Sequence, residues 1–169
     1  KYGAHIFTSN VDGQFQKAGF KEEQVMECHG SIHHMQCIDN CQGMLWSAED
    51  TFVEIEEGFK AKEPLPSCPF CGAMARPNIL MFGDFGWEYA RTNGQRERLS
   101  TWMDKLENEG AKLAIVEMGA GTAVPTVRNT SEHIAQRFDV PLIRINPRES
   151  FGAEIELPMG AVEALNEII

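Results

Sequence analysis

Four of the five cysteines stand in two close pairs. Cys37 and Cys41 form the first pair, and Cys68 and Cys71 form the second, within Cys-Pro-Phe-Cys. Two such pairs are typical of one tetrahedral zinc site, in which four thiolates leave no open coordination position. The spacing therefore predicts a structural Zn²⁺ ion bound by these four residues.

Other uses of these cysteines remain open. The first pair is one residue longer than Cys-x-x-Cys, and the insert at 42–67 is longer than usual between zinc pairs. Two disulfides, four free thiols, or a site in which His33 or His34 replaces one thiolate are the alternatives. Disulfides suit small secreted domains, and no secretory segment is visible, so zinc is the prediction that we retain.

His29 is the residue best suited to move a proton. It follows a predicted strand at 25–28 and precedes Gly30, so it could be exposed in a cleft. An unperturbed imidazole can accept a proton at pH 7. A hydrogen-bonded structural histidine is the alternative. Neighbouring Cys28 could be a nucleophile, but only His29 could activate it, so we expect a small buried strand residue.

Composition narrows the class of protein. The chain has 169 residues, 43% hydrophobic and 24% charged, which allows one domain, or one domain and a small module. Its net charge of −10 argues against a protein that binds nucleic acid directly. No apolar run approaches membrane-spanning length. An acidic segment follows the first cysteine pair, and its carboxylates predict a solvated face rather than a calcium loop: Asp50, Glu54, Glu56 and Glu57.

The elements that must position these residues alternate between strand and helix. Apolar runs predict strands at 5–10, 25–28, 77–83, 113–118 and 141–146, of which 77–83 and 113–118 read as buried. A short helix is predicted at 14–18, and a longer one at 95–107 carries the apolar stripe Leu99, Trp102, Met103 and Leu106. Another helix follows Pro125 and buries Val127, Ile134 and Phe138. The last helix is lined by Val162, Leu165 and Ile169. The order predicts an α/β fold, a Rossmann-like parallel sheet with helices on both faces, plus a small zinc-ribbon module. The sheet would use 1–30 and 77–169, and the zinc module 31–76.

Several polar or glycine residues follow the predicted strands. Ligands of parallel sheets gather at the carboxyl ends of the strands, where Asn10, His29, Gly83, Gly119 and Asn146 all lie. Their convergence predicts a nucleotide site. The Gly-x-Gly turn at 119–121 is weak support alone, because Val124 occupies the position of the third glycine in the dinucleotide-binding fingerprint. A tight strand–helix turn that binds no ligand remains an open alternative.

Six segments of the chain can be compared with known motifs, in this order: Asn10-Val11-Asp12-Gly13 with Lys17-Ala18-Gly19, Glu27-Cys28-His29-Gly30-Ser31, the four cysteines, Arg76-Pro77-Asn78-Ile79-Leu80-Met81-Phe82-Gly83-Asp84, Met118-Gly119-Ala120-Gly121 with Val124, and Ile145-Asn146. Through these segments almost the whole chain resembles the sirtuin family of NAD-dependent protein-lysine deacylases, whose motifs occur in the same order.

The resemblance implies a role for each matching residue. His29 would be the general base, acting on a ribose hydroxyl of NAD once the acyl oxygen has displaced nicotinamide. NAD would contact Ser9, Asn10, Asp12, Gly119, Ala120, Gly121, Asn146, Gly160 and Ala161. Phe82 would wall the acyl-lysine tunnel, and the segments at 83–86 and after Gly121 would pair with the substrate peptide as added strands. The zinc would be structural.

The chain also departs from the sirtuin pattern. Ser9 stands where the family has Gln, and Phe15 stands where it has His. Ala120 and Gly121 replace the family's Thr and Ser, and Asp84 replaces its Glu. These changes bear on NAD affinity and substrate choice more than on the type of reaction. The family's N-terminal glycine-rich loop is not among these residues, so we expect this span alone to bind NAD poorly and to expose apolar sheet surface.

The sequence therefore predicts an enzyme that transfers the acyl group of an acylated-lysine peptide or protein to ADP-ribose and releases nicotinamide. The alternatives are an NAD-dependent ADP-ribosyltransferase or NAD hydrolase, and a zinc-stapled module that binds peptide or nucleotide without turnover. Paired cysteines used for zinc favour a reducing, cytoplasmic or nuclear interior. The preferred acyl group and the oligomeric state are not encoded in any motif that we identify.

Overall fold

The computed structural model describes residues 3–168, which form two compact units. Unit 1 ends at Ser100 and unit 2 begins at Thr101, within helix α2 (Ala90–Asn108). Each unit is described by itself below. The predicted division into 1–30, 31–76 and 77–169 stays a prediction. Among the helices described, none has the length and apolar character that a membrane crossing needs.

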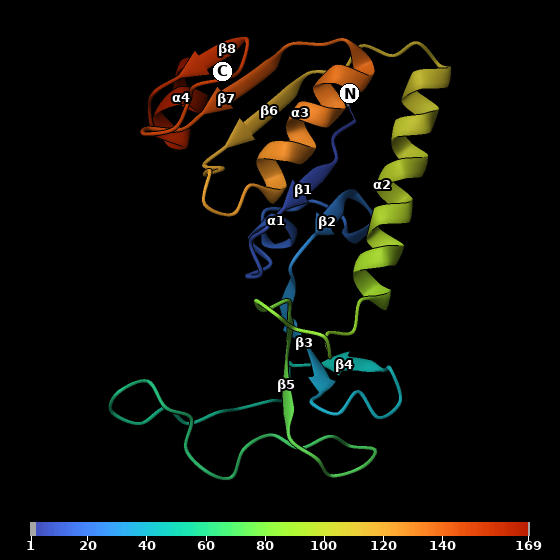
Figure 1. The fold of residues 1–169 in the computed structure, drawn as a ribbon, viewed down its shortest axis with the longest axis vertical. Helices are drawn as coiled ribbons and strands as arrows, with labels where there is room; N and C mark the ends of the chain where they lie inside the picture. Colours follow the sequence, from blue (N-terminus) through green and yellow to red (C-terminus); the bar gives the residue numbers. More distant parts are fainter. Residues whose placement is uncertain (1–2, 169) are drawn as a thin grey trace. The chain divides into compact units, whose positions relative to one another are not determined.

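Unit 1 contains a short parallel sheet. Strands β1 (Ile6–Thr8) and β2 (Val25–Glu27) pair in register, and α1 (Gln14–Lys17) and the 3₁₀ turn η1 (Glu22–Gln24) connect them (Figure 1). Val25 and Met26 are buried. The two predicted strands and the helical turn between them are confirmed.

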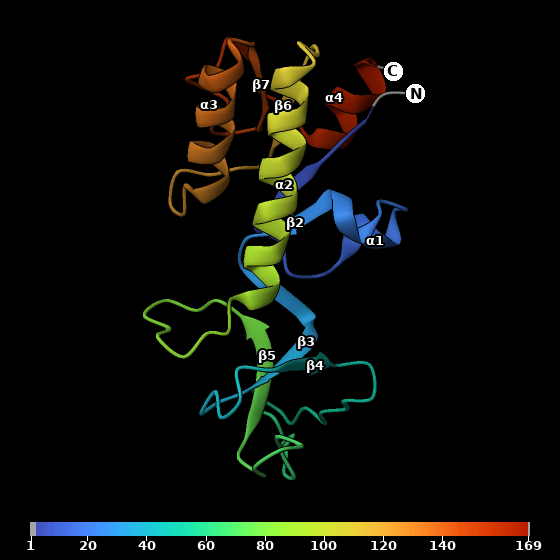
Figure 2. The same cartoon turned by 90° about the vertical axis from the view of Figure 1, so that its right-hand side faces the viewer.

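The rest of unit 1 holds an antiparallel sheet and the start of α2. Strand β3 (Gly30–Cys37) lies between β4 (Leu45–Ser47) and β5 (Ala75–Ile79), as Figure 2 shows. The predicted helix at 95–107 is confirmed within α2, which begins earlier; Leu99 is buried, and Trp102, Met103 and Leu106 are half-buried.

The predicted buried strand at 77–83 is wrong in extent and in burial. Strand β5 ends at Ile79, and a loop follows in which Phe82 is 95% exposed. The physical reason lies in Arg76, whose guanidinium bonds both the carbonyl oxygen of Ile79 and the carboxylate of Asp84 and so closes 80–83 into a loop. The apolar character of the run could not reveal this closure, because it is made by the charged residues on either side of the run.

Unit 2 is a three-stranded parallel sheet with helices. Its strand order is β6 (Ile115–Met118), β7 (Leu142–Ile145) and β8 (Ile155–Leu157), and α3 (Thr126–Phe138) packs on β6 and β7. Helix α4 (Ala161–Ile168) follows. The predicted strands, the helix after Pro125 and the last helix are confirmed, whereas β8 was not predicted.

Burial in unit 2 differs from the prediction. In β6 the buried residue is Glu117, whereas Val116 and Met118 are 43% and 42% exposed, so the apolar sheet surface that we expected to be exposed is present here. The buried residue of β6 is ion-paired instead of apolar, and two of the three buried residues of α3 are polar. Helix α3 buries Arg128, Ser131 and Ala135, with Val127, Ile134 and Phe138 half-buried; α4 buries Ala164, with Val162 77% exposed and Ile169 outside the described residues.

Candidate functional site

The four paired cysteines converge in unit 1. All four sulfur atoms lie within 4.8 Å of one another, and the Cys37–Cys71 and Cys41–Cys68 separations are both 3.7 Å. Four thiolates around one zinc ion at about 2.3 Å each would have sulfur–sulfur separations of about 3.8 Å. The donor set and its geometry therefore fit a tetrahedral metal site.

Backbone hydrogen bonds build this site from two turns. Cys37 ends β3, and Asn40 takes a positive φ of 46° so that the chain turns back toward Cys41. In the second turn, the N–H of Gly72 donates to the carbonyl oxygen of Cys68 at 2.9 Å. Both pairs are thus placed by local structure.

The alternatives for these cysteines can now be judged. All five cysteines are free, so no disulfide is present. His33 does not join the cluster, because its Nε2 bonds the carbonyl oxygen of Asp12 at 3.1 Å, and the only metal-type cluster among residues 3–168 is made of the four thiols. Burial raises the pKa of Cys68, but the N–H groups of Phe70 and Cys71 outweigh it and lower that pKa to about 7, whereas hydrogen bonds with the neighbouring thiols raise the pKa of Cys41, and the pKa of Cys71 is also raised.

His29 lies at the carboxyl end of β2, as predicted. Its carbonyl oxygen accepts a hydrogen bond from the N–H of Leu80 at 2.9 Å, which fixes the backbone, while no hydrogen bond to its half-buried imidazole occurs within residues 3–168. Gly30 has a φ of +82°, and a Cβ there would overlap the carbonyl oxygen of Asn78. The backbone beside the imidazole is therefore tightly packed while the ring stays available for chemistry.

The segment after β1 lies beside His29. The N–H of Cys28 donates to the carbonyl oxygen of Thr8 at 2.9 Å, so the ends of β1 and β2 adjoin. Asn10 is exposed, and Ser9 and Asp12 are half-buried. The structure thus brings Ser9, Asn10 and Asp12 to the same sheet end as His29, within unit 1.

The predicted nucleotide residues of unit 2 also gather at strand ends. Gly119 follows β6 and Asn146 follows β7, and the Asn146 side-chain amide donates to the carbonyl oxygen of Ala120 at 3.1 Å. A cavity of about 690 Å³ is lined here by Gly119, Gly121, Asn146 and the segment 147–149. Gly160 and Ala161 lie instead at the start of α4, outside the residues that line this cavity.

Sequence reasoning missed the residues that hold this loop. The carboxylate of Glu149 accepts hydrogen bonds from the backbone N–H of Thr122 at 3.2 Å and from its hydroxyl at 2.6 Å. A Cβ on Gly121 would meet Glu149 Oε2 at 3.0 Å, so the glycine makes room for the carboxylate. Arg128 donates to the carbonyl oxygens of Ala120, Glu149 and Phe151. Only the pairing of a short polar loop with a downstream acid could have hinted at this arrangement.

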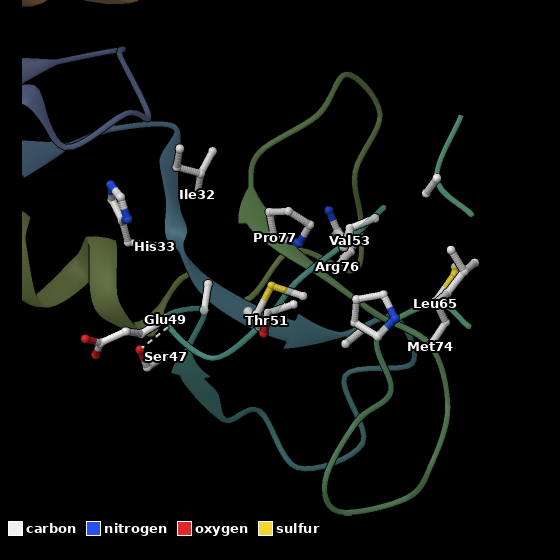
Figure 3. Close-up of a pocket in the computed structure, with 15 residues that line it drawn as sticks. Ile32, His33, Ser47, Glu49, Thr51, Val53, Leu65, Met74, Arg76 and Pro77 are labelled. Carbon is white, nitrogen blue, oxygen red and sulfur yellow. Dashed lines mark hydrogen bonds between the residues drawn. The ribbon is translucent and has the colours of Figure 1, made fainter. Parts of the chain in front are cut away.

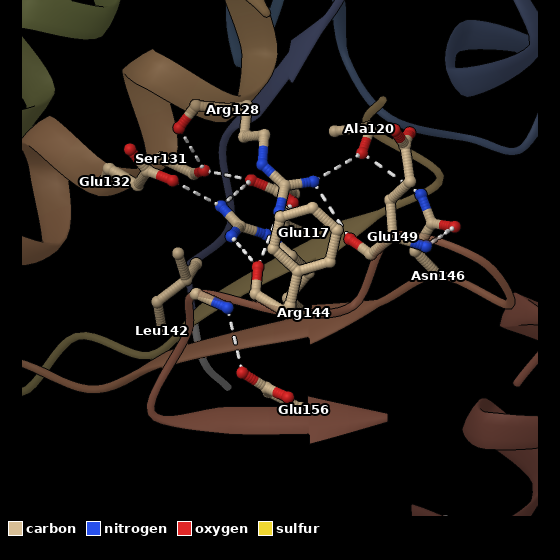
Figure 4. Close-up of polar contacts among 12 residues, drawn as sticks. Glu117, Ala120, Arg128, Ser131, Glu132, Leu142, Arg144, Asn146, Glu149 and Glu156 are labelled. Carbon is tan, nitrogen blue, oxygen red and sulfur yellow. Dashed lines mark hydrogen bonds and ion pairs between the residues drawn. The ribbon is translucent and has the colours of Figure 1, made fainter. Parts of the chain in front are cut away.

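A buried ion-pair network lies beside the contacts of this loop (Figure 4). The Arg144 guanidinium is fully buried and bonds the Glu117 carboxylate and, at 2.8 Å, Glu132. Burial alone would lower the pKa of Arg144, but the hydrogen bonds that it donates to the carboxylates of Glu117 and Glu132 raise it. Ser131 of α3 donates to Glu117 as well. The network ties α3 to β6 and β7 at the level of the candidate nucleotide loop.

The candidate substrate residues occupy the loop after β5. Phe82 is 95% exposed and Phe85 is fully exposed, and Gly83 takes a positive φ of 68°. The loop is closed by the ion pair of Arg76 and Asp84. Both carboxylate oxygens of Asp84 lie 2.8 Å from Nη2 of Arg76. Apolar rings on a fixed loop are available for contact with another molecule.

A larger cavity of about 860 Å³ lies on the sheet of β3 and β5 (Figure 3). Ile32 and Met35 line it from β3, and Val53 and Leu65 line it from the insert between the cysteine pairs. The sequence did not predict it, because the insert's backbone path is set by long-range contacts. The acidic residues of the insert are exposed, as expected.

Comparison with known proteins decides the family. The Sir2 family model matches residues 2–113, about two thirds of the chain. The chain is a member of the Sir2 family, the sirtuins. The match includes His29, the four cysteines and the loop after β5.

Individual sirtuin relatives agree with this assignment. A probable bifunctional ADP-ribose hydrolase/ADP-ribosyltransferase of Fusarium oxysporum f. sp. cubense is 30% identical over 84% of this chain and 25% of its own length. An NAD-dependent protein deacylase of Aeropyrum pernix is 29% identical over 94% of this chain and 56% of its own length. This sirtuin chain thus spans between a quarter and just over half of these relatives.

A solved structure supports the fold. The crystal structure of a Sir2 homologue in complex with NAD is 26% identical and superposes with a TM-score of 0.63, covering 97% of this chain and 56% of that one. The predicted α/β, Rossmann-like fold is confirmed, and the sirtuin chain carries four cysteines positioned to bind a metal ion.

Proposed function

We propose that this sirtuin chain is part of an NAD-dependent protein-lysine deacylase that transfers the acyl group to ADP-ribose and releases nicotinamide. The observation that carries the proposal is the imidazole of His29, which has no hydrogen bond within residues 3–168 and lies at a carboxyl strand end beside the 9–12 segment. A protein that only binds its ligand does not need an available general base at this strand end.

The residues present fit NAD. The unit 2 cavity is lined by Gly119, Gly121 and Asn146 at two strand ends, which is where parallel sheets bind their ligands. Ser9, Asn10 and Asp12 would hold the nicotinamide part, and Gly160 and Ala161 the adenine. When bound, NAD supplies the ADP-ribose acceptor and the nicotinamide leaving group.

His29 supplies the proton chemistry in this proposal. A neutral imidazole accepts a proton at a ring nitrogen, so the residue acts as the general base toward a hydroxyl group placed beside it. Zn²⁺, held by four thiolates, has no open position and therefore stabilises the fold rather than the reaction.

The substrate in this proposal is an acylated-lysine peptide or protein. Phe82 and Gly83 lie on the exposed loop after β5, where Phe82 would contact the acyl-lysine side chain. An exposed loop can also pair with an extended peptide as an added strand.

The test is an assay of the full-length protein with NAD and an acetyl-lysine peptide, followed by mass spectrometry of nicotinamide, peptide and acyl-ADP-ribose. We expect one nicotinamide and one acyl-ADP-ribose per deacylated peptide. Several acyl chains are tried in parallel. Absence of NAD consumption with all of them would contradict the proposal and favour a module that binds without turnover.

ADP-ribosyl transfer or NAD hydrolysis is the second candidate. It is favoured by the Fusarium relative, whose name includes ADP-ribosyltransferase. The same assay separates the two, because this candidate releases nicotinamide without removing an acyl group from the peptide. We further propose a reducing, cytoplasmic or nuclear location, supported by five free thiols, four of which are arranged for a metal rather than for disulfides.

A further inference from the structure

We infer that Gln36, Asn78 and Glu88, the anchoring network, are positioning residues that fix the loop at 80–86 and couple its conformation to the zinc turn. The inference rests on the proposed function in one respect: it assigns the loop to substrate contact. Its structural part stands on buried hydrogen bonds within unit 1.

The network is buried and highly connected. Gln36 and Asn78 are fully buried, and Glu88 is 8% exposed. The Asn78 side-chain amide donates to Gln36 Oε1 and to the carbonyl oxygen of Glu88, both at 2.8 Å. The N–H of Glu88 also donates to Gln36 Oε1, at 3.1 Å. Because each buried polar group relies on the others, losing one leaves its partners unpaired.

One arm of the network reaches the loop. The amide of Gln36 donates to the carbonyl oxygen of Gly86 at 2.8 Å, which fixes the end of the loop that carries Phe82 and Phe85. The opposite end is closed by the Arg76–Asp84 ion pair. The two rings are therefore almost completely exposed on a backbone that is held at both ends, which is how a contact surface is kept in one conformation.

The other arm reaches the metal turn. Glu88 Oε2 accepts a hydrogen bond from the side-chain amide of Asn40 at 3.2 Å, and Glu88 Oε1 accepts one from the N–H of Ala90 at 2.9 Å. Asn40 lies between Cys37 and Cys41, with a positive φ of 46° that the turn requires. A change in the turn on metal loss is thus transmitted through Asn40 and Glu88 to the loop.

A reciprocal exchange tests the Asn40–Glu88 link in the full-length protein. Asn40→Asp removes the hydrogen bond, because two carboxylates then face each other, whereas Glu88→Gln alone keeps it, since the Asn40 amide can turn its oxygen toward the new amide N–H₂ group. The double variant restores it with reversed polarity, since Gln can donate to the new carboxylate while its oxygen still accepts from Ala90. Aspartate tolerates the positive φ at position 40. Gln36→Met removes the other arm, and Glu54→Gln, on the exposed insert, is the matched control.

Chymotrypsin cleavage after Phe82 and Phe85, quantified by mass spectrometry, reads the loop directly, and cleavage after exposed Phe59 is the internal reference. We expect about tenfold faster loop cleavage in Asn40→Asp, in Gln36→Met and in chelator-treated protein, equivalent to about 1.4 kcal/mol. The Phe59 rate should be unchanged in the variants, and Glu88→Gln and the double variant should show the parental loop rate. Unchanged loop cleavage, or equal acceleration at Phe59 in the variants, would overturn the inference.

Deacylation kinetics provide the second readout. We expect Asn40→Asp and Gln36→Met to raise KM for the acyl-peptide while KM for NAD stays at the parental value, and the double variant to recover. Loop cleavage that behaves as expected in a protein without deacylase activity would remove the proposed function and leave the anchoring network intact. Deacylation with an unchanged peptide KM in all variants would support the proposed function and remove the role of the anchoring network in substrate contact.

Discussion

The α-carbon of Gly30 packs directly on the peptide carbonyl of Asn78. Strands β3 and β5 meet here, with Gly30 opposite Ile79, and a Cβ on Gly30 would overlap the carbonyl oxygen and lie 3.0 Å from the carbonyl carbon. The position also has a φ of +82°. The residue after the proposed base is therefore glycine for two separate physical reasons, and His29 takes its backbone position from this contact.

Gly30→Ala is expected to destabilise the protein by about 3 kcal/mol or more and to abolish activity, because the methyl group forces β3 and β5 apart at His29. Urea unfolding and the deacylation assay measure the two effects. Gly58→Ala is the matched control: its φ is +86° but nothing lies within 4 Å, so only about 1 kcal/mol of backbone strain is expected. Equal losses in both variants would contradict the packing explanation.

The four-thiolate site predicts one zinc ion per chain. Cys41→Ser is expected to lose the metal and to lower the thermal midpoint, because three thiolates leave the tetrahedral site incomplete. Cys28→Ser is the control, since Cys28 lies outside the cluster. Elemental analysis by plasma mass spectrometry gives the stoichiometry. Full zinc content in Cys41→Ser, or its loss in Cys28→Ser, would refute this assignment.

Cys28 is expected to be unreactive in the folded protein. Burial raises its pKa from 9.0 to about 11, so the thiol is neutral at pH 8 and the nucleophilic thiolate is rare. Since the folded pKa lies above the unfolded one, this group's contribution to stability is complete below about pH 9 and is lost as pH rises toward 11. Iodoacetamide labelling at pH 8, read by mass spectrometry, should modify Cys28 only after unfolding in guanidinium. Rapid labelling of the native protein would restore the nucleophile alternative.

Arg144→Met is expected to cost about 3–5 kcal/mol, because it leaves Glu117 buried without its partner. The double variant Glu117→Leu with Arg144→Met should recover most of the loss, since an apolar pair can replace a buried ion pair. Arg137→Ala is the control, whose exposed partners Asp104 and Glu107 predict at most about 1 kcal/mol. Chemical denaturation supplies the three values, and a single-variant loss under 1 kcal/mol would argue against the network.

Local pattern predicted the elements well and their surroundings poorly. Runs such as 142–145 and the glycine stops marked strands and helices correctly, because those signals are local in the chain. The pairing of Glu117 with Arg144 could not be predicted, because the two residues are 27 positions apart in the sequence. A charged residue in a strand is also normally predicted to be exposed to solvent. Strand β3 was missed because its polar residues Ser31, His33 and His34 carry no apolar alternation.

The candidate site shows the same division. The cysteine spacing predicted a cluster that the structure brings within 4.8 Å, and the strand-end rule placed Asn10 beside His29 within unit 1. Glu149 and Gln36 could not be found, because each acts through a backbone group or amide far away in the sequence. Their contribution depends on geometry that only folding creates.

The measurement that tests the central claim most directly compares the parent and His29→Ala in the full-length protein, with NAD binding by calorimetry and acyl-ADP-ribose formation by mass spectrometry. A lost general base is expected to reduce turnover by about 10²- to 10⁴-fold while NAD still binds. Turnover in His29→Ala within a few-fold of the parent would contradict the assignment of His29 as the base, and with it the proposed mechanism.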